Sequence, residues 1–246
     1  MQCSARAALA GNPSDGFGGA VLAVPVPHWT ATVRATPAAR FELAHSPTAD
    51  DTFDDLDALR HHVDRHGTSG ARELLLATVA TLADHLGLRL SPRRLDVSTG
   101  IPRGVGLGGS SAIVIASIRS LLASAGAPEL PPDELSALAL AVETEGLGIR
   151  AGLQDRVVQS YDAPVMMRFD AASHRRIGRF EVGTYEALAP AAPIDVLIAA
   201  RPAAAEPSDV PHADLRARDR SDDPSFRRAV DELAASADDA AAAWRD

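Results

Sequence analysis

One stretch of the sequence decides the fold, Pro102-Arg-Gly-Val-Gly-Leu-Gly-Gly-Ser-Ser-Ala112. A β-rich run at 95–98 leads into it, and a helical pattern at 112–125 leads out. A glycine-rich turn from strand to helix exposes several backbone N–H groups at the positive end of the helix. Phosphate is the commonest ligand of such a site. Its glycines let the backbone approach a ligand closely, and its serines can cap the helix or hold a metal-bound phosphate. We therefore expect a phosphate-binding loop.

Two common glycine-rich motifs nearly fit this stretch, and both fail. Gly104, Gly106 and Gly109 spell G-x-G-x-x-G, but a dinucleotide site also needs an acidic residue at the end of a second strand about 20 residues later. In this chain Glu129 stands there without such a strand. A P-loop needs Lys before its Ser, where Ser110 stands, and all 24 basic residues are Arg. No lysine can therefore reach a nucleotide phosphate.

The stretch resembles the second motif of the GHMP kinases, Pro-x-x-x-Gly-Leu-Gly/Ser-(x)-Ser-Ser-Ala followed by a helix. Residues 5–15 are similar to the first motif of that family, with Asn12 and Pro13 in place of its Glu-His pair. Residues 151–156 resemble the segment that carries the catalytic aspartate. The combination looks most like the glucuronokinase-type sugar 1-kinases, and the resemblance runs from about residue 5 to 170.

The third family motif, a glycine-rich loop near the C-terminus, has no counterpart between 162 and 246. Three explanations remain open. The chain is a fragment, or another polypeptide supplies the missing part, or the protein binds nucleotide or sugar as a sensor or subunit without being a working kinase.

The resemblance implies an α+β fold in two layers. We expect an ATP-binding domain like domain 2 of ribosomal protein S5 over residues 1–160, and an incomplete ferredoxin-like domain over 161–246. A polar loop at about 201–224 is expected to be a flexible lid or disordered. Hydrophobic periodicity predicts strands at 3–10, 19–26, 29–35, 40–44, 163–169 and 194–200, and helices at about 55–63, 70–86, 112–125, 131–145 and 226–244.

The resemblance also implies an activity, the ATP-dependent phosphorylation of a small molecule, most simply a sugar at its anomeric hydroxyl. A uronic acid is the leading acceptor, and a heptose phosphate or hexose is next. The residues matched to ATP binding are Pro102, Gly104, Gly106, Leu107, Gly108, Gly109, Ser110, Ser111 and Ala112. ATP would lie between the strand before this loop and the helix after it.

The remaining matched residues divide into metal, catalytic and substrate positions. Ser111 and Glu143 would hold Mg²⁺, and Glu145 is the rival of Glu143. Asp155 would be the general base, with Arg6 keeping its carboxylate ionised and offsetting phosphate charge. The residues expected to contact sugar hydroxyls are Asn12, Ser14 and Asp15, although their sequence also suits a simple turn. The candidates to pair with a substrate carboxylate are Arg103, Arg150 and Arg156.

Composition excludes several classes of function. The net charge of −9 argues against nonspecific binding of nucleic acid. Cys3 is the only cysteine, so no disulfide framework exists. The longest apolar run, 112–118, is too short to span a bilayer, and the N-terminus lacks a signal pattern. We expect a cytoplasmic protein that binds ATP and a sugar, as a possible homodimer or with a partner polypeptide.

Overall fold

The computed structural model describes residues 1–43, 52–66, 71–87, 90–149, 151–189, 195–199, 209–221 and 223–245. Within these residues a seven-stranded sheet has the order β4-β3-β5-β2-β6-β9, and β1 pairs with β2. Its strands are β1 (Gln2–Ala10), β2 (Ala20–Pro37), β3 (Phe41–Leu43), β4 (Thr52–Phe53), β5 (Arg93–Thr99), β6 (Val165–Arg168) and β9 (Thr184–Ala187). The pairing is antiparallel except between β3 and β5. A short 3₁₀ helix, η1 (Ser14–Phe17), joins β1 to β2, and β7 (Arg175–Ile177) forms a separate hairpin with β8 (Phe180–Val182).

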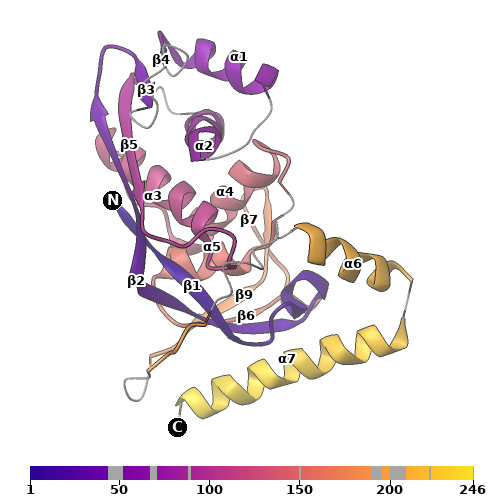
Figure 1. Ribbon diagram of the computed structural model, residues 1–246. Helices are drawn as coiled ribbons and strands as arrows, with labels where there is room; N and C mark the ends of the chain where they lie inside the picture. Colours follow the sequence, from indigo (N-terminus) through magenta and orange to yellow (C-terminus); the bar gives the residue numbers. More distant parts are fainter. Residues whose placement is uncertain are drawn as a thin grey trace.

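Helices cover both faces of the sheet. Figure 1 shows α1 to α5 gathered above the lower part of the β1–β2 hairpin and α7 below it. The helices are α1 (Leu56–His66), α2 (Ala71–Leu86), α3 (Gly109–Ser124), α4 (Pro132–Thr144), α5 (Gln154–Tyr161), α6 (Asp209–Arg220) and α7 (Pro224–Arg245). The α+β fold class predicted from the sequence is confirmed.

Alternating residues of β2 separate the layers, because successive side chains of a strand point to opposite faces. Val21 and Ala23 pack with Val157 and Val158 of α5, whereas Leu22 packs on the opposite face with α7. α3 belongs to the layer formed by α1 to α5. Val114, Ile115 and Ile118 are fully buried, as are many other residues of this helix. A helix that is apolar around most of its circumference must be buried in this way.

The sequence predicted two strands, 19–26 and 29–35, where the structure has the single 18-residue strand β2. Residues 20–23 of β2 pair with β6 and residues 31–37 pair with β5, so the strand changes neighbour along its length. Pro25 and Pro27 fall between these segments, where only β1 pairs with β2. Their missing N–H groups therefore interrupt no ladder on the β5–β6 side, and the strand continues through them.

Other boundaries also differ from the prediction. α3 begins at Gly109 rather than at 112, and the strand predicted at 163–169 is the shorter β6. Residues 195–199 form no strand, and Leu197 is 94% exposed, so the strand predicted at 194–200 is wrong where it is described. Residues 194 and 200 lie outside the described part.

The predicted polar loop at 201–224 contains a helix. Residues 209–220 form α6, whereas 201–208 and 222 lie outside the described part. α6 is joined to α7 by an ion pair between Asp219 and Arg227. A helix this polar lacks the apolar periodicity by which a sequence reveals helices.

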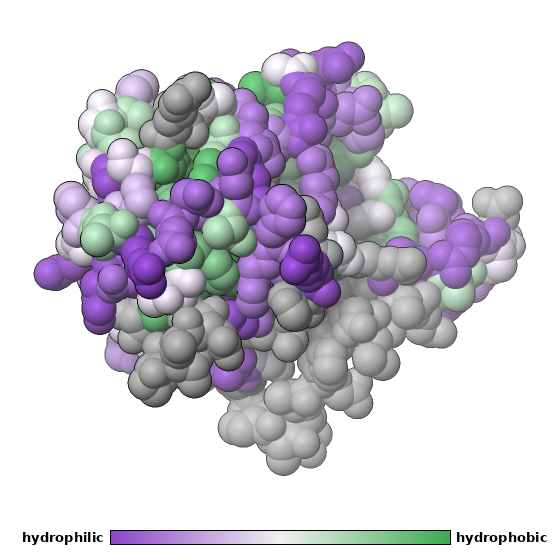
Figure 2. Space-filling model, turned by 90° about the horizontal axis from the view of Figure 1, so that it is seen from above, coloured by the Kyte–Doolittle hydropathy of each residue, from purple (hydrophilic) through white to green (hydrophobic). Residues whose placement is uncertain are grey.

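The division of the chain at residue 160 and the incomplete ferredoxin-like domain stay predictions. β6 and β9 follow that boundary and extend the same sheet as the N-terminal strands. Polar residues cover most of the described surface in the view of Figure 2, with hydrophobic residues in smaller areas between them. Among the described helices, none combines the length and the hydropathy that a membrane span requires.

Candidate functional site

The glycine-rich stretch connects β5 to α3, as the sequence predicted. Gly108 precedes the first helical residue with φ of 68°, a conformation that glycine adopts at little cost. A Cβ atom at this position would lie 2.9 Å from Nε2 of Gln159, so space as well as backbone geometry requires glycine. α3 has 16 residues and no acidic side chain in its first turn. Its N-terminus therefore offers unpaired N–H groups and positive potential to an anion.

The residues predicted to bind ATP divide into an outer and an inner group. The exposed residues are Pro102, Gly104, Gly106 and Ser110, and Gly108 and Gly109 are half-buried. Leu107, Ser111 and Ala112 are buried, and Leu107 anchors the loop in the main hydrophobic core. The outer group can meet a ligand, and Leu107 and Ala112 hold the loop against the core.

Arg6 and Asp155 meet beside this loop. Nε of Arg6 donates a 2.7 Å hydrogen bond to Oδ1 of Asp155, and the two side chains are 13% and 22% exposed. The backbone N–H of Arg6 also donates to the carbonyl of Leu107, at 3.1 Å. Asp155 is the second residue of α5, so the positive end of that helix favours its negative charge. The structure thus brings the predicted catalytic pair next to the predicted phosphate loop.

Gln159 is a residue of this region that the sequence analysis missed. Its side chain is buried, and its Nε2 donates to the carbonyls of Ser4 at 3.0 Å and Gly108 at 2.8 Å. Gln159 lies four residues after Asp155 on α5, on the same face of the helix. This spacing is the one signal in the sequence that would have pointed to it.

Glu143 is buried in an ion pair with Arg156. Nε of Arg156 donates to Oε2 of Glu143 at 2.7 Å, and Glu143 is 1% exposed. Oε1 of Glu143 is buried and has no hydrogen-bond partner among the described residues. A carboxylate oxygen with unused lone pairs is the kind of ligand that Mg²⁺ takes. The hydroxyl of Ser111 donates to the carbonyl of Gly108 at 3.0 Å, which leaves its own lone pairs for a cation. Both predicted ligands therefore fit Mg²⁺ chemically.

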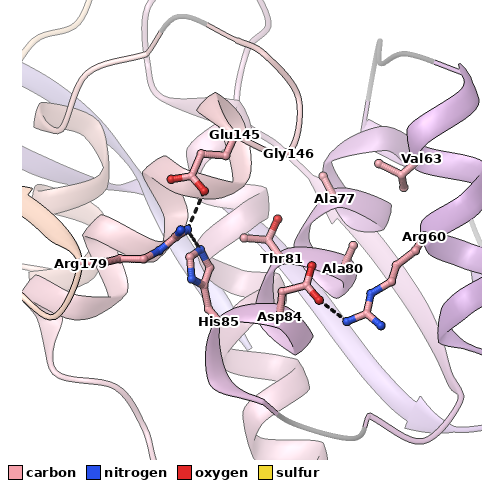
Figure 3. Close-up of a pocket in the computed structure, with 10 residues that line it drawn as sticks. All are labelled: Arg60, Val63, Ala77, Ala80, Thr81, Asp84, His85, Glu145, Gly146 and Arg179. Carbon is pink, nitrogen blue, oxygen red and sulfur yellow. Dashed lines mark hydrogen bonds and ion pairs between the residues drawn. The ribbon is translucent and has the colours of Figure 1, made fainter.

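Glu145, the rival of Glu143, lies in different surroundings. Its side chain is 55% exposed and accepts a 2.6 Å hydrogen bond from Nη2 of Arg179. Figure 3 shows Glu145 among the residues that line a pocket formed with α1 and α2. The pocket has a volume of about 580 Å³, and neither the glycine-rich loop nor Asp155 lines it. In this pocket Arg179 also contacts His85, whose pKa is lowered by burial and by the nearby guanidinium. Glu143 has an unpaired buried oxygen and Glu145 is held in an exposed ion pair, and the role of Glu143 as a metal ligand stays a prediction.

The turn between β1 and β2 lies against the segment that precedes Asp155. A Cβ atom on Gly152 would be 3.3 Å from Oδ2 of Asp15, so this carboxylate borders the catalytic segment. Asn12 is exposed. Ser14 is fully buried, and its hydroxyl donates to the carbonyl of Ala20 at 2.8 Å. The structure therefore gives Ser14 a place within the turn, and its contact with a sugar stays a prediction.

The arginines considered for a substrate carboxylate are not equivalent. Arg156 is 5% exposed, and its guanidinium binds Glu143 and the carbonyl of Gly152, so it is buried and engaged within the protein. Arg103 is exposed on the loop, and residue 150 lies outside the described part.

Comparison with known proteins identifies a family model and two curated relatives that match the chain. Residues 73–162, which contain the loop, Glu143 and Asp155, match the N-terminal domain of the GHMP kinases. The chain is 33% identical over 181 residues to glucuronokinase 1 of Arabidopsis thaliana, a match covering 71% of this chain and 50% of that protein. It is 32% identical over 163 residues to probable glucuronokinase 2 of the same plant, covering 64% and 44%. The chain thus spans about half the length of these curated relatives.

Solved structures support the same fold. The mevalonate kinase of Methanococcus jannaschii aligns with a TM-score of 0.54 at 19% identity, over 68% of this chain and 52% of that one. The galactokinase of Lactococcus lactis aligns with a TM-score of 0.57 at 16% identity, over 76% and 46%. The match of the N-terminal domain, the similarity to the two glucuronokinases and the fold lead to one conclusion: this chain belongs to the GHMP kinase superfamily.

Proposed function

We propose that the protein is an ATP-dependent sugar kinase that phosphorylates the anomeric hydroxyl of its acceptor. One observation carries this proposal. Arg6 bonds to Asp155 through its side chain and to the loop carbonyl of Leu107 through its backbone. A carboxylate, a guanidinium and a phosphate cradle therefore lie within the reach of one residue, and phosphoryl transfer needs these groups close together.

In this proposal each group has a separate task. The N–H groups at the start of α3 bind phosphate oxygens, and Arg6 offsets the negative charge that they carry. Asp155 orients the acceptor hydroxyl and accepts its proton as the new bond to phosphorus forms, and ADP leaves. Mg²⁺, held by Ser111 and Glu143, would supply further neutralisation of the phosphate charge.

A uronic acid is the proposed acceptor. The similarity to two glucuronokinases supports it, and a hexose or a heptose phosphate is the next choice. Asn12 and Asp15 are the proposed contacts to sugar hydroxyls, because their turn borders the segment that leads into Asp155. Arg103, exposed on the loop, is available for the carboxylate.

The test is a screen of ADP release over uronic acids, hexoses and heptose phosphates, with phosphorus NMR to identify a sugar 1-phosphate. We expect turnover with a uronic acid, and turnover slower on the order of 10²–10⁴-fold with the Asp155→Asn variant. Binding of Mg-ATP without transfer to any acceptor would instead favour a nucleotide- or sugar-binding module. Absence of Mg-ATP binding would refute the loop as an ATP site, both in a kinase and in a nucleotide-binding module.

A further inference from the structure

The carbonyl of Gly108 is the most heavily bonded acceptor of the glycine-rich loop. It accepts hydrogen bonds from Nε2 of Gln159 at 2.8 Å, from the hydroxyl of Ser111 at 3.0 Å and from the backbone N–H of Ala112 at 3.0 Å. Ser111 and Ala112 belong to α3, which the carbonyl precedes directly. Gln159 alone of these three donors comes from another element, α5.

The direction of this carbonyl fixes the direction of an N–H donor. The C=O of Gly108 and the N–H of Gly109 belong to one peptide plane, and in a trans peptide the two groups point in opposite directions. When the carbonyl points inward to Gln159, the N–H of Gly109 points outward, toward the place where the helix N-terminus attracts an anion. The first N–H groups of a helix have no partner within the helix, so this donor is free for a ligand.

Gln159 also connects the loop to the two residues of the proposed chemistry. Its second hydrogen bond goes to the carbonyl of Ser4 on β1, two residues before Arg6. Gln159 also shares the helix α5 with Asp155. The side chain is 1% exposed, and Oε1 has no hydrogen-bond partner among the described residues. Oε1 of Gln159 is therefore a buried acceptor without a partner, which lowers the stability of the fold. The two N–H donors of the same amide join β1 to the loop.

From these contacts we propose that Gln159 is a positioning residue, which fixes the peptide between Gly108 and Gly109 so that its N–H faces a bound phosphate, in register with Arg6 and Asp155. This inference rests on the proposed binding of ATP by the loop. Gln159 touches neither substrate in this scheme; it acts through the loop backbone.

The test uses two replacements of Gln159 and a control on the same helix. Gln159→Met keeps the length of the side chain and removes both donors, and Gln159→Glu keeps the shape but sets a carboxylate against two carbonyl oxygens. The control is Tyr161→Phe, which removes the hydrogen bond from Tyr161, the last residue of α5, to Asp133 and leaves the hydrogen bonds of the loop in place. Hydrogen exchange is measured without ligand at the amide of Ala112, which donates to the carbonyl of Gly108, and at the helical amides that follow it. Binding of Mg²⁺ with a non-hydrolysable ATP analogue is measured by calorimetry.

We expect Gln159→Met to speed the exchange of these amides and to weaken binding of the analogue, each on the order of tenfold for two lost hydrogen bonds. Gln159→Glu should weaken binding at least as much, and Tyr161→Phe should change neither quantity although it also loses a hydrogen bond. Variants of Gln159 that exchange and bind like the parent protein would overturn the positioning role while leaving the proposed kinase intact. If Tyr161→Phe speeds exchange and weakens binding as much as Gln159→Met does, the positioning role is also overturned, because the effect would then be general destabilisation.

The failure of the proposed function has a different signature. If the parent protein does not bind the ATP analogue, the proposed function fails and the phosphate-directing part of this inference fails with it. Any change of exchange at Ala112 and the amides that follow it would then report only on the folding of the loop and of the start of α3.

Discussion

Arg6 and Asp155 are 149 residues apart in the chain and are joined by a 2.7 Å hydrogen bond between Nε and Oδ1. The pair links the first strand of the sheet to the start of α5, and the backbone of Arg6 extends the link to the phosphate loop. An ion pair this poorly exposed holds its geometry better than a surface pair, because water competes for it less. The first two predictions test the roles of Asp155 and Glu143.

Replacing Asp155 with Asn keeps the shape of the side chain and removes the base. We expect kcat to fall on the order of 10²–10⁴-fold, the usual contribution of general base catalysis. Binding of Mg-ATP should persist, because the phosphate cradle is formed by other residues. Turnover, nucleotide affinity and melting temperature measured on this one variant separate a catalytic role from a structural one.

The control for this variant is Asp238→Asn. It weakens another Arg–Asp ion pair, which joins Arg168 of β6 to Asp238 of α7. It should leave kcat unchanged. A stable Asp155→Asn protein with turnover close to that of the parent would contradict the assignment of the base.

Replacing Glu143 with Gln should raise the Mg²⁺ concentration needed for half-maximal activity by about tenfold or more, since a charged oxygen ligand is lost. The same change leaves the buried Arg156 without a counter-charge, so the free energy of unfolding should fall by about 3 kcal/mol. The measurements are a Mg²⁺ titration of activity and urea unfolding. Glu145→Gln, which breaks an exposed pair, should cost about 1 kcal/mol or less and leave the Mg²⁺ requirement alone. The reverse pattern would mean that Glu145 is the ligand.

Replacing Ser111 with Ala removes one of the donors to the carbonyl of Gly108 and one proposed metal ligand. A ligand that binds only the native state raises the melting temperature, so Mg-ATP should stabilise the parent protein. We expect a smaller shift in Ser111→Ala and the smallest shift when Ser110→Ala is added. NAD should produce no shift in any of them. A clear shift with NAD would restore the dinucleotide interpretation of the three glycines.

Cys3 should be inert in the folded protein. Burial raises the pKa of its thiol above the ordinary 9.0 to about 12, Arg119 opposes the change and Asp162 adds to it. The native protein should therefore react with iodoacetamide at pH 8 only as fast as it unfolds, whereas the denatured chain reacts freely. Because the folded pKa is the higher one, this thiol contributes stability that is complete below pH 9 and is lost as the pH rises toward 12. Mass spectrometry after timed alkylation checks the first expectation, and rapid labelling of the native protein would refute it.

The sequence by itself determined the features that depend on local chemistry. The glycines and serines of 102–112 predicted a loop between a strand and a helix, because few other residues tolerate such a turn at a helix N-terminus. The spacing of apolar residues predicted α2 and α7, since burial of one face imposes a period of 3.6 residues. Arg6, Glu143 and Asp155 were named from motifs, and the structure brings Arg6 and Asp155 into contact.

Only the tertiary structure decided the features that depend on residues far apart in the chain. Pro25 and Pro27 read locally as an interruption, but β2 runs through them because its neighbour strand changes there. Ser14 carries the same hydroxyl in a turn or a sugar site, and only the nearby carbonyl of Ala20 makes it a buried turn residue. Glu143 lies in the last turn of α4 and Glu145 directly follows that helix, so the two side chains point in different directions, and a sequence does not say which of them meets Arg156.

Gln159 makes the same point for the candidate site. Its side chain is an ordinary polar group on a helix until β1 and the loop supply carbonyls at 3.0 and 2.8 Å. Local sequence fixes which groups a residue can donate or accept, whereas the fold alone fixes which groups of distant segments come within hydrogen-bonding distance of them.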